Sequence, residues 1–501
     1  MTDHRRVTVE GRQFELSPGI TAAAASCNHD RPAVRTSVTG SPRGPLCGMG
    51  VCFECRATVD GEPHVRTCAT HATRPPSIST EMACDVLVVG AGPAGQAAAR
   101  EAASRGRSVI VVDDNASPGG QIWRRDHAHP RVSPLEQDAC RLGATFVQQS
   151  MVLGRDDRGA MMVAREGAST GCTVAFRRLV LATGASERFV PFPGWTLPGV
   201  MGAGALQAML KQGMDVRGRR VVVAGSGPLL LAVAALARRS RGARVVGIVE
   251  QSPPRRVRGM LPSLLGQPGK LLQGAGLLAS LAFVPRFGGW WPVAALGDDR
   301  VRAVEITDGT RRRRLACDVL ACGFGLVPRT RLAATLGCRV VGGAVMTDHR
   351  GATSVPDVFA AGECTGIGGV GKSIVEGRIA GAAAAGDDTL ASTLAPRLAR
   401  ELAFMRALAS CYALRPELRT LAADDTIVCR CEDVARGSLR AMGSWREAKL
   451  RTRLGMGPCQ GCVCGPIASM LEGWTVEDAR PPAFNVPLAA LRGLHQGTTT
   501  P

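Results

Sequence analysis

Two copies of one local pattern constrain the fold of this 501-residue chain most strongly. Each copy has a short apolar strand, a glycine-rich turn and a helix rich in small apolar residues, which is how a βαβ unit of a parallel sheet begins. The first copy reads DVLVVGAGPAG from Asp85 and continues into a predicted helix over 96–104. The second copy begins at Arg219. Two starts in one chain predict two nucleotide-binding domains, one inserted in the other.

The glycines of the first turn stand where a phosphate-binding turn needs them. The first permits the tight turn, the second lets a pyrophosphate approach the backbone, and the third brings helix and strand close. The helix N-terminus then faces the phosphates. An acidic residue ends the next strand, at 109–112, where a ribose hydroxyl would sit; the spacing suits either Asp113 or Asp114, and we prefer Asp113. The predicted dinucleotide-binding residues of the turn are Gly90, Gly92, Pro93, Ala94 and Gly95.

The second turn departs from the pattern at one position. It reads VVVAGSGPLL from Val221, and the third glycine is replaced by Leu230. A side chain there is expected to hinder close packing and push the helix away from the strand, which disfavours NAD(P)H use. A structural or regulatory adenine nucleotide (ATP or NAD(P)H) and an empty site are the alternatives. The predicted site residues are Gly225, Gly227 and Glu250.

Four of the 18 cysteines form an N-terminal cluster with the spacing C-x4-C-x2-C-x12-C. Glycines between the first two leave a loop free to fold around an iron–sulfur cluster, and a hairpin at Asp60-Gly61 can return the fourth thiol to it. This spacing is typical of plant-type [2Fe–2S] sites, with zinc as the alternative. The segment resembles the ferredoxin-like domain of succinate and xanthine dehydrogenases. The predicted ligands are Cys47, Cys52, Cys55 and Cys68.

A second cluster of five cysteines lies near the C-terminus. A C-x-C pair followed by a later C-x2-C resembles the small [2Fe–2S] domain of bacterioferritin-associated ferredoxin, in the form fused to flavin-containing amine and opine dehydrogenases. Those relatives usually carry C-x4-C, which selects Cys464 where the C-x2-C spacing selects Cys462. The fourth ligand is therefore open between these two, and zinc is again an alternative. The other predicted ligands are Cys429, Cys431 and Cys459.

Several later segments resemble the two-dinucleotide-domain flavoproteins of the glutathione-reductase type: PGGQ at 118–121, LATG at 181–184 and VPDVFAAGE at 355–363. The resemblance implies FAD in the first site. Glu363 stands where the family usually has an aspartate that contacts the flavin ribityl chain. A C-x-x-C near Gly119 is absent from the sequence, so disulfide-reductase chemistry lacks its dithiol. The flavin contacts implied are Gly120, Gln121, Thr183, Gly184, Gly362 and Glu363.

The predicted fold class is α/β: a two-dinucleotide-binding-domain flavoprotein with an N-terminal β-grasp ferredoxin-like domain and a small helical C-terminal [2Fe–2S] domain. The flavin domain thus stands between the two cysteine clusters in the sequence. The predicted boundaries are 1–75 (ferredoxin-like), 82–215 (FAD, first part), 216–330 (inserted second nucleotide domain), 331–395 (FAD, second part), 396–422 (helical linker), 423–480 (second [2Fe–2S]) and 481–501 (tail), with a further linker at 74–80.

Composition excludes two function classes. The formal net charge is +19, yet no block of five basic residues occurs, so nucleic-acid binding is not expected. No apolar run reaches the roughly 18 residues of a membrane span, and the first residues lack the apolar core of a signal peptide. We therefore expect a cytoplasmic protein, with peripheral attachment to the inner face of the membrane left open by the positive charge.

Over about residues 5–475 the order of domains resembles a fusion of the two smaller subunits of hydrogen cyanide synthase. It equally resembles the A subunits of opine oxidases and the α subunits of heteromeric proline, hydroxyproline and sarcosine dehydrogenases. The resemblance implies a hetero-oligomer in which a catalytic, FAD-dependent, amino-acid-oxidase-like β subunit oxidises an amino or imino acid. This chain would relay the electrons to a respiratory acceptor or oxygen. We assign no catalytic residue, and a self-sufficient NAD(P)H-dependent reductase and a non-catalytic sensor or scaffold are the alternatives.

Overall fold

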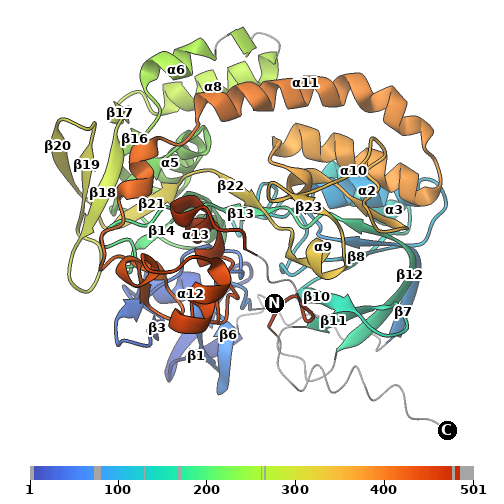
Figure 1. The fold of residues 1–501 in the computed structure, drawn as a ribbon, viewed down its shortest axis with the longest axis horizontal. Helices are drawn as coiled ribbons and strands as arrows, with labels where there is room; N and C mark the ends of the chain where they lie inside the picture. The colour runs from blue at the N-terminus through green and yellow to red at the C-terminus, as the bar shows by residue number, and fades with distance from the viewer. Residues whose placement is uncertain are drawn as a thin grey trace.

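The two glycine-rich turns lie in two separate sheets, and a smaller sheet precedes them in the chain (Figure 1). In this computed structural model the described residues are 5–72, 81–128, 130–165, 171–260, 262–263, 267–476 and 480–485. The predicted linker at 74–80 and the predicted tail beyond residue 485 lie outside them.

The N-terminal region forms a four-stranded sheet in the order β2-β1-β5-β6, packed against one short helix. The turn at Asp60-Gly61 joins β5 to β6 as the sequence predicts, and both residues have positive φ, at 51° and 84°. A two-residue hairpin turn of the type that matches strand twist needs this conformation. The elements are β1 (Arg5–Val9), β2 (Arg12–Leu16), α1 (Ala22–Asn28), β3 (Arg35–Thr36), β4 (Pro42–Arg43), β5 (Arg56–Val59) and β6 (Glu62–Arg66).

The first glycine-rich turn belongs to a seven-stranded sheet in the order β10-β11-β12-β7-β8-β9, with β25 paired to β12. Strands β7, β8, β9, β12 and β25 run parallel, so their carboxyl ends meet at one edge. The elements are β7 (Glu81–Val89), α2 (Pro93–Ala103), β8 (Val109–Val112), α3 (Pro134–Arg141), β9 (Thr145–Val147), β10 (Ser150–Arg155), β11 (Met161–Arg165), β12 (Cys172–Leu181), β25 (Val358–Ala360), η1 (Gly362–Thr365) and α10 (Gly369–Ala385).

Helices α2 and α10 pack with almost no side chain between them. A Cβ atom on Gly377 would lie 2.2 Å from the carbonyl oxygen of Ala94, and one on Gly381 would lie 2.3 Å from that of Ala98. The two backbones are therefore in direct contact. This packing explains why both helices are rich in alanine and glycine, and it brings the late segment around Glu363 up to the first turn.

The second turn belongs to a five-stranded parallel sheet in the order β14-β21-β15-β16-β17, flanked by an antiparallel sheet β18-β19-β20. Strand β15 starts at Arg220, one residue after the predicted start. The elements are β13 (Ala185–Glu187), β14 (Val200–Gly202), α4 (Ala203–Lys211), β15 (Arg220–Gly225), α5 (Leu229–Arg241), β16 (Arg244–Glu250), α6 (Pro254–Gly259), α8 (Pro268–Ser280), β17 (Arg286–Gly288), β18 (Trp291–Leu296), β19 (Ala303–Thr307), β20 (Arg312–Ala316), β21 (Val319–Gly323) and β22 (Leu326–Pro328).

Leu230 does not expel its helix from the sheet, which corrects our expectation. Its side chain is 1% exposed and packs in one apolar cluster with Val221 and Val223 of β15. The effect on the helix is small. Counted from the first glycine of each turn, α5, which starts at Leu229, begins one residue later than α2, which starts at Pro93. The core accepts the leucine because the later start leaves room for it.

A long helix, α11 (Thr389–Cys411), leads to the C-terminal cysteine region, which lies beside the N-terminal sheet (Figure 1). None of the helices within the described ranges has the length and apolarity that crossing a bilayer requires. The remaining elements are α9 (Arg331–Thr335), β23 (Val340–Val341), β24 (Ala344–Val345), η2 (Pro416–Thr420), β26 (Ile427–Cys429), β27 (Val434–Ala435), η3 (Arg436–Leu439), α12 (Trp445–Thr452) and α13 (Cys464–Glu472).

Candidate functional site

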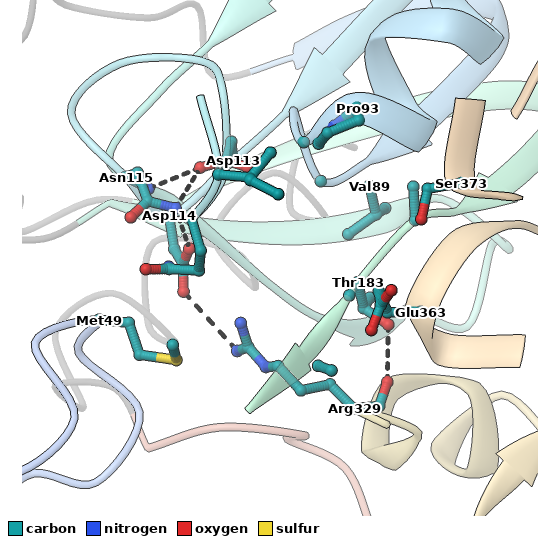
Figure 2. A pocket seen from close by; sticks show the side chains of 18 of the residues that line it. Met49, Val89, Pro93, Asp113, Asp114, Asn115, Thr183, Arg329, Glu363 and Ser373 are labelled. Carbon is teal, nitrogen blue, oxygen red and sulfur yellow. Dashed lines mark hydrogen bonds and ion pairs between the residues drawn. The ribbon is translucent and has the colours of Figure 1, made fainter. Parts of the chain in front are cut away.

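A deep pocket opens at the carboxyl edge of the seven-stranded sheet, beside the first glycine-rich turn (Figure 2). The edge where parallel strands end is where α/β folds bind nucleotides. Ala94, Gly95 and Gly362 stand just behind the lining, in the contacts between turn, helix and late segment. The predicted residues that line the pocket are Gly90, Gly92, Pro93, Asp113, Asp114, Gly120, Gln121, Thr183, Gly184 and Glu363.

The turn has the geometry that its glycines predict. Gly90 has φ of +105°, and a Cβ atom there would lie 2.3 Å from the carbonyl oxygen of Ala182. A Cβ atom on Gly95 would lie 1.7 Å from the carbonyl oxygen of Gly90. Larger residues would therefore separate strand, turn and helix, and the helix N-terminus would no longer face the pocket.

Two acidic side chains, Asp113 and Asp114, lie side by side in the lining of the pocket (Figure 2). The Asp113 carboxylate accepts the N–H of Ala91 at 2.6 Å and two N–H groups of Asn115, at 2.7 and 2.8 Å. Burial and the neighbouring charge of Asp114 raise the pKa of Asp113. Asp114 instead faces the guanidinium of Arg329, 3.8 Å away. Asp113 thus links the turn to the end of β8, whereas Asp114 places its carboxylate beside Arg329.

Glu363 carries a buried oxygen atom without a partner. Its Oε1 accepts the N–H of Gly369 at 2.6 Å, while Oε2 has no hydrogen bond within the described residues. Burial raises the pKa of this carboxyl group. A buried acceptor that lines a pocket needs a donor from a ligand. The ribityl hydroxyls of a flavin are such donors, so the residues present fit FAD.

The second glycine-rich turn contacts a distant part of the chain. The segment 411–415, at the end of α11, lies beside it: the Ser226 hydroxyl donates to the carbonyl oxygen of Tyr412 at 3.0 Å. The amide group of Gln251, which is fully buried, donates to the Ala413 carbonyl at 3.1 Å and accepts the N–H of Arg415 at 3.1 Å. Main-chain groups of this segment are therefore held against Ser226 of the turn.

Glu250, at the end of β16, contacts the second turn as Asp113, after β8, contacts the first. Its carboxylate accepts the N–H of Gly227 at 2.7 Å and that of Ser252 at 2.8 Å. Burial raises its pKa to about 7, although these N–H groups favour the charged form. The structure thus brings together Gly225, Gly227 and Glu250 as predicted, and Glu250 binds main-chain N–H groups as Asp113 does.

The four N-terminal thiols are buried together in two hydrogen-bonded pairs, Cys47 with Cys52 and Cys55 with Cys68. Burial opposes ionisation of Cys47, but Cys52 and the N–H of Met49 outweigh it and lower the pKa to about 6. The N–H groups of Met49 and Glu54 each point to a cysteine sulfur at 3.4 Å. Each iron of a [2Fe–2S] centre takes two thiolates, so two thiol pairs with backbone donors fit that group.

The C-terminal thiols also form two pairs, and Cys464 rather than Cys462 belongs to one of them. Cys429 pairs with Cys464, and Cys431 pairs with Cys459. Cys464 is buried at the start of α13, whereas Cys462 lies in the preceding turn, is partly exposed and joins neither pair. Within the described ranges, no three His, Cys, Asp or Glu side chains are arranged to hold a single metal ion as they stand.

Sequence reasoning missed two residues that join the pocket to the N-terminal thiols. Met49, in the cysteine loop, lines the pocket directly, and so does Glu187 of β13. Burial raises the pKa of Glu187 to about 8, although the N–H of Gly204 at the start of α4 favours its charged form. Met49 could have been found from its place between two predicted ligands. No local pattern marks Glu187, because its role depends on contacts distant in the sequence.

Comparison with known proteins gives a consistent result. Residues 84–388 match the family model described as pyridine nucleotide-disulphide oxidoreductase, and residues 4–82 match a 2Fe-2S iron-sulfur cluster binding domain. The chain is 33% identical to the A subunit of opine oxidase from Agrobacterium tumefaciens, over 81% of this chain and 88% of that protein. It is 34% identical to the HcnB subunit of hydrogen cyanide synthase from Pseudomonas aeruginosa, over 75% and 90% of the two chains.

A solved structure agrees on the fold. L-proline dehydrogenase from P. horikoshii superposes with a TM-score of 0.67 and 18% identity, over 97% of this chain and 98% of that one. The predicted flavoprotein fold, FAD as its cofactor and the N-terminal [2Fe–2S] domain are thereby confirmed. The chain belongs to the pyridine nucleotide-disulphide oxidoreductase family of flavoproteins, as an FAD- and iron–sulfur-containing oxidoreductase related to opine oxidase and hydrogen cyanide synthase subunits.

Proposed function

We propose that this chain is the electron-transferring subunit of an amino-acid or imino-acid dehydrogenase of the opine, proline, sarcosine or glycine type. The observation that carries this proposal is that the loop with Cys47, Cys52 and Cys55 supplies one wall of the flavin pocket through Met49. A two-electron cofactor and a one-electron centre would then lie next to each other in one chain. FAD, when bound, can accept two electrons and release them singly to iron–sulfur centres.

The chain's own residues would bind and orient that cofactor. The N–H groups after Gly90 would bind the pyrophosphate, Asp113 would position the ribose, and Oε2 of Glu363 would accept a ribityl hydroxyl. Apolar side chains such as Val89 and Val152 would exclude water from the part of the pocket near Asp113. The proposed ligand sets are Cys47, Cys52, Cys55 and Cys68 for one [2Fe–2S] centre and Cys429, Cys431, Cys459 and Cys464 for the other.

Substrate oxidation is assigned to a partner flavoprotein because the pocket offers little for it. Among the described residues that line the pocket there is no histidine, cysteine or lysine. The buried acids there are engaged with backbone N–H groups, such as Glu187 with Gly204 and Glu363 with Gly369. The names of the relatives as subunits support a hetero-oligomer with such a catalytic partner.

The NAD(P)H-dependent alternative is disfavoured by the segment 411–415 that lies against the second turn. We propose that this site holds no exchangeable pyridine nucleotide in the working protein. A sensor or scaffold without turnover is the remaining alternative.

Co-expression with a candidate flavoprotein partner tests the proposal. The purified complex should reduce a dye with at least one of a panel of N-alkyl amino acids, proline derivatives and glycine, and neither protein should do so by itself. An intact complex that turns over none of these substrates would contradict the assignment and favour the scaffold alternative.

A further inference from the structure

The two cysteine loops touch each other through charged residues that they themselves contain. Glu54 lies between Cys52 and Cys55, and Arg430 lies between Cys429 and Cys431. The Arg430 Nε atom donates to Glu54 Oε2 at 2.8 Å, and the two side chains are 2% and 1% exposed. Sequence separation is 376 residues, so the fold brings these loops together.

Further polar contacts bind the same two regions. Arg35 donates to Glu54 and, at 3.0 Å, to the carbonyl oxygen of Arg430. Arg43 pairs with Asp433 at 2.6 Å, with both side chains 4% exposed or less. The N-terminal sheet region and the C-terminal cysteine region, which lie side by side in Figure 1, therefore share a dry, ionic interface.

Arg430 is placed more tightly than an ion pair alone requires. Its guanidinium lies over the Trp195 ring, 5.0 Å from the centroid, and Nη1 donates to the Trp195 carbonyl oxygen at 3.0 Å. Its Nη2 atom is buried and donates to no atom in the part of the chain that the structure describes. A buried guanidinium N–H between two groups of thiols is a donor available to sulfur.

The Glu54 carboxylate belongs to the N-terminal cysteine loop and contacts the C-terminal loop through Arg430. Arg430 carries the opposite charge at the same place.

We propose that Glu54 and Arg430 are positioning residues that join the two iron–sulfur sites into one electron-transfer unit and set the potentials of both. One electron would pass directly between the two centres: one centre is oxidised as the other is reduced, with no bond or proton transferred. Met49 of the N-terminal loop lines the flavin pocket, and Gln460 of the C-terminal loop accepts a hydrogen bond from Arg331, next to Leu332 of the lining, so either site could exchange electrons with the flavin side. This inference rests on the proposed function.

Redox titration of the full, cofactor-loaded chain tests the inference. Reduction adds negative charge to a centre, so Glu54→Gln should raise the potentials of both centres and Arg430→Gln should lower both. The Glu54→Gln, Arg430→Gln double variant should return towards the wild-type values, and Arg430→Lys should shift them least. A shift at one centre only, or the same sign for both single variants, would overturn the proposal.

Electron paramagnetic resonance of the fully reduced wild-type chain gives a test that does not depend on any variant folding. The two reduced centres should show a magnetic interaction that disappears when only one is reduced. Arg105→Gln, which breaks more exposed ion pairs with Asp387 and Glu101, should leave the interaction and both potentials unchanged.

Two different results separate failure of this inference from failure of the proposed function. Iron at both sites without magnetic interaction would contradict this inference but not the proposed function. Lack of iron at the C-terminal site would sink the proposed two-centre relay itself.

Discussion

The two glycine-rich turns have similar sequences and differ in what lies against them. At the first, Gly90 to Gly95 faces an open pocket in which Oε2 of Glu363 lacks a donor from the described residues. At the second, Ser226 is hydrogen-bonded to the main chain of Tyr412, in the segment 411–415. In both turns the acid after the next strand is bound by main-chain N–H groups, so the difference lies in the residues that face each turn.

Breaking the first turn should have the largest effect. Gly95→Leu would place a side chain against the carbonyl oxygen of Gly90, so we expect more than nine-tenths of the bound flavin to be lost. Flavin per chain, measured by absorption after denaturation, checks this. The matched control is Gly274→Leu in α8, where an added Cβ would meet no atom within 4 Å among the described residues and flavin should stay at the wild-type level. A Gly95→Leu protein with full flavin would contradict the account of this turn.

The buried acid of the second turn should make stability depend on pH. Because the folded-state pKa of Glu250 is raised to about 7, folding takes up a proton between the ordinary carboxyl pKa and that value. Its contribution to the free energy of unfolding is complete at low pH and falls by up to about 3 kcal/mol as pH rises through this window.

Glu250→Gln cannot take up that proton. The difference in unfolding free energy between wild type and Glu250→Gln should therefore drift in favour of the variant from pH 5 to pH 7.5, as denaturant unfolding would measure. A difference that stays constant with pH would show that Glu250 is already ionised at low pH.

Removing the side chain that holds segment 411–415 should lower the free energy of unfolding by a smaller amount. Gln251→Ala removes the amide that binds the main chain of Ala413 and Arg415, and leaves their polar groups without it. We expect a loss of about 2 kcal/mol in unfolding free energy with flavin content unchanged. Gln137→Ala, at an exposed position of α3, should change stability by less than about 0.5 kcal/mol. Equal costs for the two substitutions would mean that the segment is not held by Gln251.

The smallest expected effect concerns the open pocket. Glu363→Gln keeps an oxygen for the N–H of Gly369 but replaces the unpartnered oxygen with a donor. FAD affinity should fall about tenfold, which corresponds to about 1.4 kcal/mol, as equilibrium reconstitution of the flavin-free protein would show. Glu363→Asp should bind FAD within a few-fold of wild type. The opposite order of the two variants would argue against contact with the ribityl chain.

Local chemistry explains what the sequence could predict. Strand β7, helix α2 and the acids after β8 follow from alternating apolar runs, glycine positions and one strand end, all within about 30 residues. The Asp60-Gly61 hairpin is local in the same way. The cysteine spacings likewise indicated which thiols come together.

The features that the sequence could not predict depend on contacts between segments far apart in the chain. The Glu54–Arg430 pair, the contact of Ser226 with Tyr412 and the burial of Glu187 each join segments that no local pattern relates. The position of Leu230 was misjudged because the effect of one side chain depends on where its helix can begin. The pairing of Cys464 rather than Cys462 with Cys429 depends on the start of α13, which a spacing alone does not give.

Anaerobic mixing of the purified, flavin-loaded chain with NADH or NADPH tests the central claim most directly. If the second turn holds no exchangeable pyridine nucleotide and electrons arrive from a partner protein, the flavin absorption band stays unchanged with either nucleotide, while dithionite bleaches it. Rapid bleaching by NADH or NADPH would show that the second turn binds and uses pyridine nucleotide, and it would contradict the account.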